Sequence, residues 1–338
     1  MIRGAWPAAL AAVAVALMPG AQPPAIDRHA LVDRHNVTLA ALDPESPLSV
    51  GNGEFAFTVD ATGLQTFPAL YEQTIPLGTQ SQWGWHTAPN PDGWSIDRSA
   101  FREFTSHGRM VGYADIPGDR TPEINWLRAN PHRLHLGRIG FRLTRADGSA
   151  AEPSDLTEIR QTLDLWNGVI VSHFRFDGEP VDVETVSHPA MDGVGVRIRS
   201  PLLGTGRVAI EFRFPYGTGQ TTAADWTKPD AHRTARSQPY PDEARFARAL
   251  DDDTYHAAVR WSAGGTMADA GPHTYVLSAA PGSETFAFTS VFTPKPAAGR
   301  PHGFDATVSA ARAHWNRFWS TGGAIDLAGS ADPRWREL

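Results

Sequence analysis

The sequence predicts an all-β protein, a large antiparallel supersandwich of two sheets, followed by a C-terminal linker helix. Between residues 133 and 292, short runs of alternating apolar and polar residues are separated by turn signals such as Asp147-Gly148 and Asn167-Gly168, a pattern typical of antiparallel hairpins. So many short strands favour two stacked sheets. Near residue 308 the apolar period becomes helical, with Trp315 and Trp319 four positions apart.

The first residues have the three parts of a secretory signal peptide, which we place at residues 1–21. Arg3 precedes an apolar run from residue 5 to residue 18, and the small residues Gly20 and Ala21 follow it. This run is shorter than the ~20 residues that a stable membrane-spanning helix needs. The sequence therefore predicts a secreted or periplasmic protein with no membrane span after cleavage. A retained membrane anchor is the alternative.

The composition argues against several classes of function. The formal net charge is -7 and Lys228 and Lys295 are the two lysines, so we expect no nucleic acid partner, because binding to phosphates requires concentrated positive charge. The chain has no cysteine, which excludes disulfides and thiolate metal ligands within it. It also lacks the glycine-rich phosphate-binding patterns and the serine-nucleophile pattern. We therefore predict no cofactor.

The N-terminal third is predicted to hold a strand, a hairpin and a long loop region. Residues 30–42 fit an initial strand and linker. In residues 48–60, a Gly-Asn-Gly turn precedes alternating Phe55, Phe57 and Val59, which predicts a half-buried hairpin with Asn52 as a left-handed turn residue. Residues 70–126 have few alternating runs and many turn-forming residues. Their tryptophans argue against disorder, so we predict a long functional loop region.

From residue 133 onward the predicted strands are dense. They are residues 134–143, 159–165, 168–176, 181–186, 193–199, 208–214, 255–261, 274–277 and 286–292. The polar stretch 216–250 is predicted to form another loop. Residues 294–299 are rich in proline and alanine, which indicates an exit linker into the helix at residues 308–319.

Four features in this order carry a family resemblance. They are Val-Gly-Asn-Gly at residues 50–53, the segment 76–86 that ends in Trp-Gly-Trp-His, the segment 127–134, and the tryptophan linker 315–326. Together they resemble the N-terminal region of bacterial exported six-hairpin glycosidases, which include glycoside hydrolase families 65 and 95. In those enzymes a galactose mutarotase-like supersandwich precedes an (α/α)6 barrel.

The resemblance implies a domain division and a place for the catalytic groups. Residues 27–293 would be the supersandwich, and residues 294–338 would be the linker and the start of a barrel that is truncated here. In those enzymes the barrel carries the catalytic carboxylates, so the resemblance implies that they lie beyond Leu338. We accordingly name no catalytic residue in this chain.

The aromatic loop region contains the residue types that bind sugars. Pyranose faces stack on tryptophan rings, and their hydroxyl groups pair with amide and imidazole groups. The candidate substrate-binding residues are Gln80, Gln82, Trp83, Trp85, His86, Trp94, Trp126, Asn130 and His132. The alternative is that these tryptophans fill the core beneath a loop. The histidine groups lack the i, i+4 helical spacing of zinc sites, so no metal site is predicted.

Two functions remain open from the sequence. The first is the non-catalytic N-terminal domain of an exported glycoside hydrolase, forming part of the wall of a carbohydrate site beside the barrel of the same polypeptide. A lyase or phosphorylase of the same architecture would share this domain. The second is a complete carbohydrate-binding β-sandwich protein without catalysis.

Overall fold

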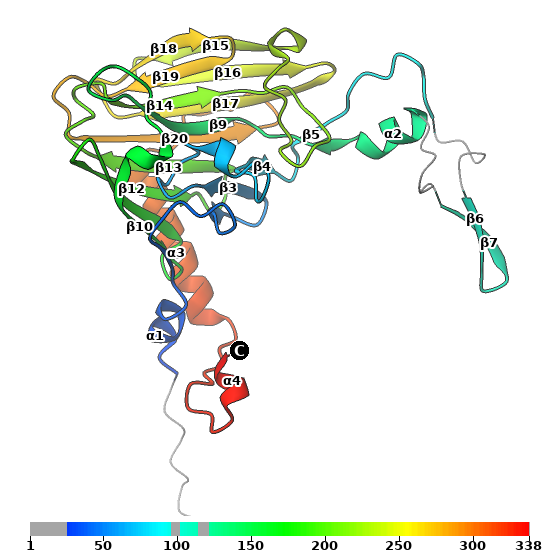
Figure 1. The fold of residues 1–338 in the computed structure, drawn as a ribbon, viewed down its shortest axis with the longest axis horizontal. Coiled ribbons are helices and arrows are strands. Elements are labelled where there is room, and N and C mark those ends of the chain that lie inside the picture. The colour runs from blue at the N-terminus through cyan, green and yellow to red at the C-terminus, as the bar shows by residue number, and fades with distance from the viewer. Residues whose placement is uncertain (1–25, 96–101, 114–121, 338) are drawn as a thin grey trace, which may run out of the picture.

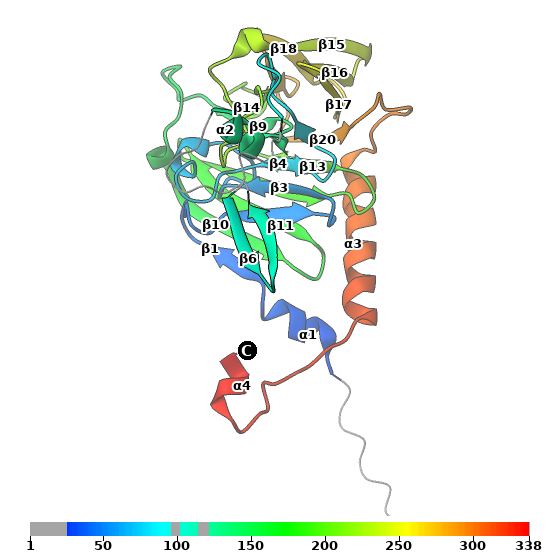
Figure 2. The same ribbon diagram turned by 90° about the vertical axis from the view of Figure 1, so that its right-hand side faces the viewer.

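The predicted all-β architecture is confirmed. The computed structural model describes residues 26–95, 102–113 and 122–337, so the predicted signal peptide and two parts of the loop region lie outside the described residues. Figures 1 and 2 show two β layers packed face to face, with a long helix against the outer side of one layer. No helix in the described part of the chain is long and apolar enough to cross a membrane.

The larger layer is a nine-stranded antiparallel sheet. Its strands in spatial order are β1 (Val37–Leu39), β10 (Leu156–Asp164), β11 (Val169–Phe176), β12 (Glu179–Ser187), β13 (Gly193–Arg199), β20 (Thr285–Thr293), β17 (Asp253–Trp261), β16 (Glu243–Leu250) and β15 (His232–Tyr240). In the middle of this sheet β13 pairs with β20, from Gly193↔Val291 to Arg199↔Thr285. The last strand of the chain is therefore inserted between two groups of sequential hairpins.

The facing layer consists of a four-stranded and a three-stranded sheet. The first has the order β18 (Thr266–Gly271), β19 (Thr274–Ser278), β14 (Val208–Arg213) and β9 (Arg138–Leu143), and the second has the order β2 (Leu48–Gly51), β3 (Phe55–Val59) and β4 (Thr79–Ser81). Short 3-10 turns occur at Pro68–Leu70, Pro153–Asp155 and Pro229–Ala231.

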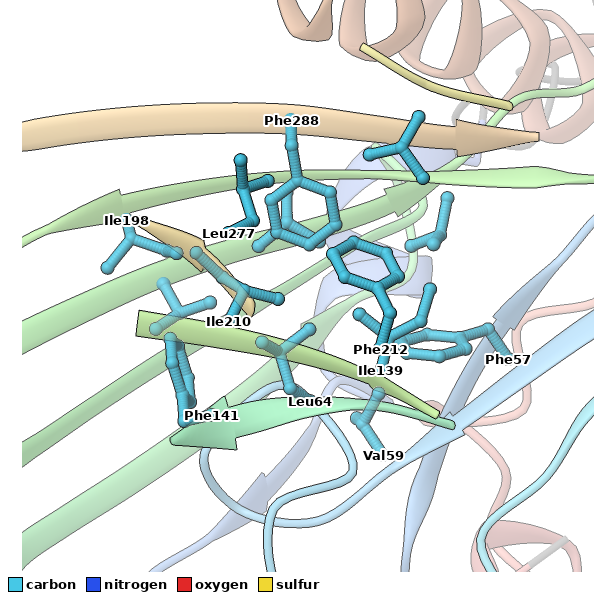
Figure 3. Close-up of a cluster of buried hydrophobic side chains, with 14 of the residues drawn as sticks. Phe57, Val59, Leu64, Ile139, Phe141, Ile198, Ile210, Phe212, Leu277 and Phe288 are labelled. Carbon is cyan, nitrogen blue, oxygen red and sulfur yellow. The ribbon is translucent and has the colours of Figure 1, made fainter. Parts of the chain in front are cut away.

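The core lies between the two layers. Alternating side chains of each strand point inward, and those of β13 and β20 meet those of β9, β14 and β19. The buried side chains that Figure 3 labels are Phe57, Val59, Leu64, Ile139, Phe141, Ile198, Ile210, Phe212, Leu277 and Phe288. Across the interface, the rings of Phe212 and Phe288 pack edge to face with centroids 5.6 Å apart.

A turn built around Asp60 brings Leu64 into this core. The fully buried Asp60 carboxylate accepts four hydrogen bonds, through Oδ1 from the Thr62 N–H (2.9 Å) and hydroxyl (2.6 Å) and through Oδ2 from the N–H groups of Thr66 (2.7 Å) and Phe67 (2.8 Å). Thr62 is buried and Thr66 and Phe67 are half-buried, so their backbone N–H groups have limited access to water and need an acceptor within the protein. The Asp60 side chain thus provides the hydrogen-bond acceptors that a neighbouring strand would otherwise supply to the backbone of this turn.

Helix α3 (Phe304–Thr321) packs on the outer face of the nine-stranded sheet, against β12, β13 and β20. Its Phe304, Val308 and Ala311 form a second apolar cluster with residues of β11 and β12. Further along, the Trp319 indole N–H donates to the Leu165 carbonyl at 2.6 Å. The predicted helix is confirmed, and both termini of the described chain carry short helices, α1 (Arg28–Asp33) and α4 (Pro333–Glu337).

The linker into α3 is held by a cluster of arginines around a buried glutamate, which we call the linker clasp (Glu243, Arg245, Arg260 and Arg300). Glu243 is fully buried and accepts from Arg245 Nε at 2.7 Å and Arg300 Nε at 2.8 Å. Arg245 and Arg260 donate in turn to backbone carbonyls of residues 297, 299 and 301. The clasp therefore fixes the start of the helix relative to the sheet.

Three local predictions are wrong. Residues 216–250 are not one loop, because they contain β15 and β16. Residues 30–42 contain α1 before β1, since Asp27 caps the helix by accepting from the Ala30 N–H at 3.0 Å. The region 70–126 is not a continuous loop: besides β4 it contains β5 (Trp85–His86), the hairpin β6 (Arg102–Ser106) and β7 (Arg109–Tyr113), and the start of α2 (Pro122–Ala129).

Candidate functional site

Most of the predicted sugar-binding residues gather around one short strand pair. Strand β5 pairs with β8 (His132–Arg133), in the register Trp85↔Arg133 and His86↔His132. From this pair two segments extend away from the sandwich, residues 87–95 and residues 122–131 with α2, which we call the arm segments (Figure 1). They carry Trp94, Trp126 and Asn130.

Trp85 forms a supported aromatic surface at this pair. Its side chain is 44% exposed, while its indole N–H donates to the Gln82 carbonyl at 2.9 Å. The Arg133 guanidinium carbon lies 4.1 Å from the centre of the ring, and Arg133 also donates to the carbonyls of Ser81 (3.2 Å) and Gln82 (3.1 Å). The ring is therefore fixed at its edge and on one face while remaining partly open to solvent, with the exposed Gln82 beside it.

Trp94 and Trp126 face each other across the two arm segments. Their ring centroids are 6.2 Å apart with the planes tilted by 57°, and both side chains are half-buried. The Trp126 indole N–H donates to the Pro89 carbonyl at 3.2 Å. Asn90 holds the backbone of Trp94 through two hydrogen bonds of 2.8 Å each. This aromatic pair contributes to the packing of the arm segments as well as presenting ring edges to solvent.

His86 and His132 stand at the base of the arm segments. Nδ1 of the buried His86 is 2.9 Å from Nε2 of His132, and Nε2 of His86 is 2.9 Å from Oδ2 of Asp251. The Tyr216 hydroxyl donates to the same carboxylate oxygen at 2.6 Å. The Asn130 amide oxygen accepts from the Ala88 N–H at 2.8 Å and so joins the two arm segments.

Trp83 and Gln80 lie apart from this group. The Trp83 ring packs against the core, and its N–H donates to Asp192 Oδ2 at 2.7 Å. Asp192 also accepts from the Ser81 hydroxyl. Together with the exit linker, Trp83 and Asp192 line a groove of about 470 Å³. Gln80 is half-buried in β4, opposite Ala56 of β3.

Asn52 acts through its side chain rather than through a left-handed backbone. Its Oδ1 accepts from the N–H groups of Glu54 (2.9 Å) and Phe55 (2.7 Å), and the positive φ of this turn belongs to Gly53, at 93°. The prediction that Asn52 is a turn residue is therefore correct in place but wrong in conformation.

Several residues of this region had no sequence signal of their own. Arg133, Asp192, Tyr216, Asp251 and Asp253 are brought to the candidate residues by the fold. Asp251 and Asp253 belong to an acidic run at the turn between β16 and β17, which a correct prediction of those strands would have located. Among the described residues, no three His, Cys, Asp or Glu side chains gather so as to hold a metal ion.

No protein-family model matches this chain, and no curated protein matches it. Among solved structures, a protein assigned as a kojibiose phosphorylase from the human microbiome is similar, with a TM-score of 0.53 and 9% identity over 88% of this chain and 40% of that chain. A family GH92 alpha-mannosidase from Bacteroides thetaiotaomicron gives a TM-score of 0.22 and 7% identity over 54% of this chain and 28% of its own. This chain thus shares the fold of less than half of the phosphorylase.

Proposed function

We propose that this chain is the non-catalytic N-terminal supersandwich of an exported carbohydrate-active enzyme and that the surface around Trp85 forms part of the wall of its sugar site. In this proposal residues 27–293 are the supersandwich, residues 294–338 lead into a helical barrel, and the barrel supplies the acid and base. The partly exposed Trp85 ring, held by Arg133 and by its own indole N–H, is the observation that carries the proposal.

The chemistry of this surface fits a sugar ring. An aromatic face that is already fixed loses little conformational freedom when a pyranose stacks on it. Gln82, whose backbone carbonyl accepts from the Trp85 indole, is exposed and carries a side-chain amide that can both donate and accept. The fold shared with a protein assigned as a kojibiose phosphorylase supports carbohydrate as the ligand class, and kojibiose is the first sugar to test.

The test is isothermal titration calorimetry of the 338-residue chain with kojibiose and a panel of other disaccharides. We expect weak binding of at least one sugar, and we expect Trp85→Ala to weaken it about five- to tenfold, the value of one aromatic stack. Trp335→Ala is the matched control, because Trp335 is 51% exposed but lies in α4. Equal affinity of the two variants would contradict a role for Trp85.

Catalysis is tested separately by incubating the same sugars with the chain, with and without inorganic phosphate, and separating the products. The proposal expects no turnover, so cleavage of any glycoside would contradict it. The alternative is a carbohydrate-binding protein complete in itself. A stop codon directly after the Leu338 codon would favour that alternative, and a reading frame that continues into paired helices would favour the enzyme.

A further inference from the structure

The hydrogen bonds around His86 and His132 require a definite number of protons. His132 Nδ1 lies 2.9 Å from the Ala129 carbonyl, so this nitrogen carries a proton. His86 Nε2 lies 2.9 Å from the Asp251 carboxylate, so it carries a proton as well. The contact between His86 Nδ1 and His132 Nε2, at 2.9 Å, requires one proton between the two nitrogens.

The total is three protons on two imidazole rings, whereas two neutral rings carry one each, or two together. With these hydrogen bonds, His86 and His132 together bear one positive charge, and Asp251 supplies the matching negative charge. Tyr216 does not compete for the role of acid, because burial and its hydrogen bond to Asp251 raise the pKa of its hydroxyl. It remains a donor to the carboxylate.

Loss of the shared proton leaves one of these contacts without a hydrogen. If His86 keeps its proton on Nε2, two lone pairs face each other between the rings; if it moves to Nδ1, a lone pair faces the carboxylate. His86 has little room to move aside. His86 is buried, and Gly217 is so close that a Cβ built on it would lie 2.4 Å from His86 Nδ1.

The two histidines occupy the points where the arm segments leave the sandwich. His86 immediately precedes residues 87–95, and His132 immediately follows residues 122–131. The arm segments also contact each other, through the Ala88 N–H and Asn130 and through Trp94 and Trp126. They are joined to the sandwich by the Thr87 N–H, which donates to Asp253 at 3.1 Å. Through their hydrogen bonds, His86 and His132 thus link both arm segments to Asp251 of the sandwich, and we call this link the tie.

We propose that His86 and His132 share one proton and that this proton ties the arm segments to the sandwich, so that its loss as the pH rises releases them. This inference concerns the placement of Trp94 and Trp126 and does not depend on the ligand of the Trp85 surface.

Several charged and titratable groups set the pH at which the tie opens. The pKa of His132 is lowered, first by burial and also by the charge of His86, whereas its hydrogen bond to the Ala129 carbonyl and the charge of Asp253 oppose this effect only in part. The groups that face the pair or its carboxylate partner are Asp251, Asp253, Tyr216 and, around the Tyr216 ring, Asp225, Lys228 and His232. Because the pKa of His132 is lowered, we expect release at a pH below the ordinary histidine value of about 6.5.

The experiment measures the distance between one arm segment and the sandwich. The chain contains no cysteine, so Asp92→Cys and Ser237→Cys, both at exposed positions, introduce two unique sites for nitroxide spin labels. Double electron–electron resonance is recorded at about pH 5 and about pH 8. We expect a narrow distance distribution at the lower pH and the loss of at least about half of that narrow component at the higher pH.

Two variants in the labelled background distinguish the tie from a general effect of pH. His132→Gln should keep the narrow distribution at both pH values, because a side-chain amide can turn to donate to neutral His86 or to accept from charged His86. His173→Gln is the matched control. It alters another histidine bonded to an aspartate, Asp182 at 2.8 Å, and should behave like the parent.

Three results would overturn the proposal: an unchanged distribution in the parent, broadening at the lower rather than the higher pH, or a pH dependence that persists in His132→Gln. Should His132→Gln fail to fold, ¹⁵N spectra of the histidine rings in the unsubstituted chain decide. They must show three protonated nitrogens on His86 and His132 together at the lower pH, and two protonated nitrogens there would refute the shared proton.

Discussion

Replacing Asp60 by asparagine tests whether one buried carboxylate organises the turn that places Leu64 in the core. The substitution keeps the shape of the side chain but replaces one of its two acceptor oxygens with an amide donor. In one orientation the new NH2 group faces the N–H groups of Thr66 and Phe67, and two half-buried donors lose their acceptor. In the other orientation it faces Thr62, whose hydroxyl can rotate to accept, and one buried N–H is left unpaired.

The amide will adopt the second orientation because it leaves fewer donors unpaired. One buried N–H without a partner costs about 1–3 kcal/mol. Part of this cost is offset, since burial raises the pKa of Asp60 and a neutral amide has no charge to desolvate. We therefore expect the free energy of unfolding to fall by about 1–2 kcal/mol, the lower part of that range.

The assay is urea unfolding followed by far-ultraviolet circular dichroism at neutral pH. Asp147→Asn is the matched control, because Asp147 Oδ1 accepts the same two bonds from the N–H (2.9 Å) and hydroxyl (2.6 Å) of Ser149 but lies in an exposed turn. The control should stay within about 0.5 kcal/mol of the parent. If both variants unfold at the same urea concentration, the reasoning about Asp60 is refuted.

Three further predictions concern other parts of the chain. Burial and the charge of Arg138 lower the pKa of His135 to about 3. Below about pH 6.5 the unfolded chain therefore takes up a proton at His135 that the folded chain does not. The free energy of unfolding should fall by up to about 1.4 kcal/mol for each pH unit of acidification. Urea midpoints at pH 7 and pH 5 should show a smaller fall for His135→Gln. A Cβ on Gly168 would lie 2.0 Å from Trp315, whereas a Cβ on Gly178, also at positive φ, meets nothing within 4 Å. Gly168→Ala should therefore destabilise the protein by about 1–3 kcal/mol more than Gly178→Ala; equal urea midpoints would argue against the docking of α3. Glu243→Gln removes the charge that Arg245 and Arg300 share in the linker clasp, and amide hydrogen exchange should quicken in residues 294–303 while staying unchanged in β17.

The apolar periodicity was sufficient to predict most of the sheet. Strands such as β11, β13 and β20 are buried on one or both faces, so their β-branched and aromatic residues stand out from the turns around them. The prediction failed for β15 and β16. Strand β15 lies at the edge of the sheet, where one side is solvated, and β16 places the charged Arg248 among its buried core residues Phe246 and Leu250. Its Arg248 is buried and donates to backbone carbonyls of residues 215 and 233, which no pattern of hydrophobicity can anticipate.

The candidate site was predictable by residue type but not by arrangement. The tryptophans and amides of residues 80–132 predict a sugar-binding surface, but the sequence cannot tell that Trp83 packs against the core while Trp85, two positions later, is exposed. A turn separates the two residues, because the Gly84 N–H donates to the Ser81 carbonyl at 3.0 Å and Trp85 begins the new strand β5, which is set by its pairing with β8. The acidic partners of His86 and Thr87 come from a turn more than 160 positions away.

The position of β20 in the middle of the large sheet has a consequence for the synthesis of the protein. Strand β13 ends at Arg199 and its neighbour β20 begins at Thr285, so at about 5–20 residues per second the ribosome needs roughly 4–17 s to supply the missing neighbour. During that interval the nascent chain carries an apolar strand with an open hydrogen-bonding edge, which is a template for aggregation. Synthesis that stalls or terminates within this interval should yield insoluble product, and chaperone supply should limit the yield of this protein more than its final stability does.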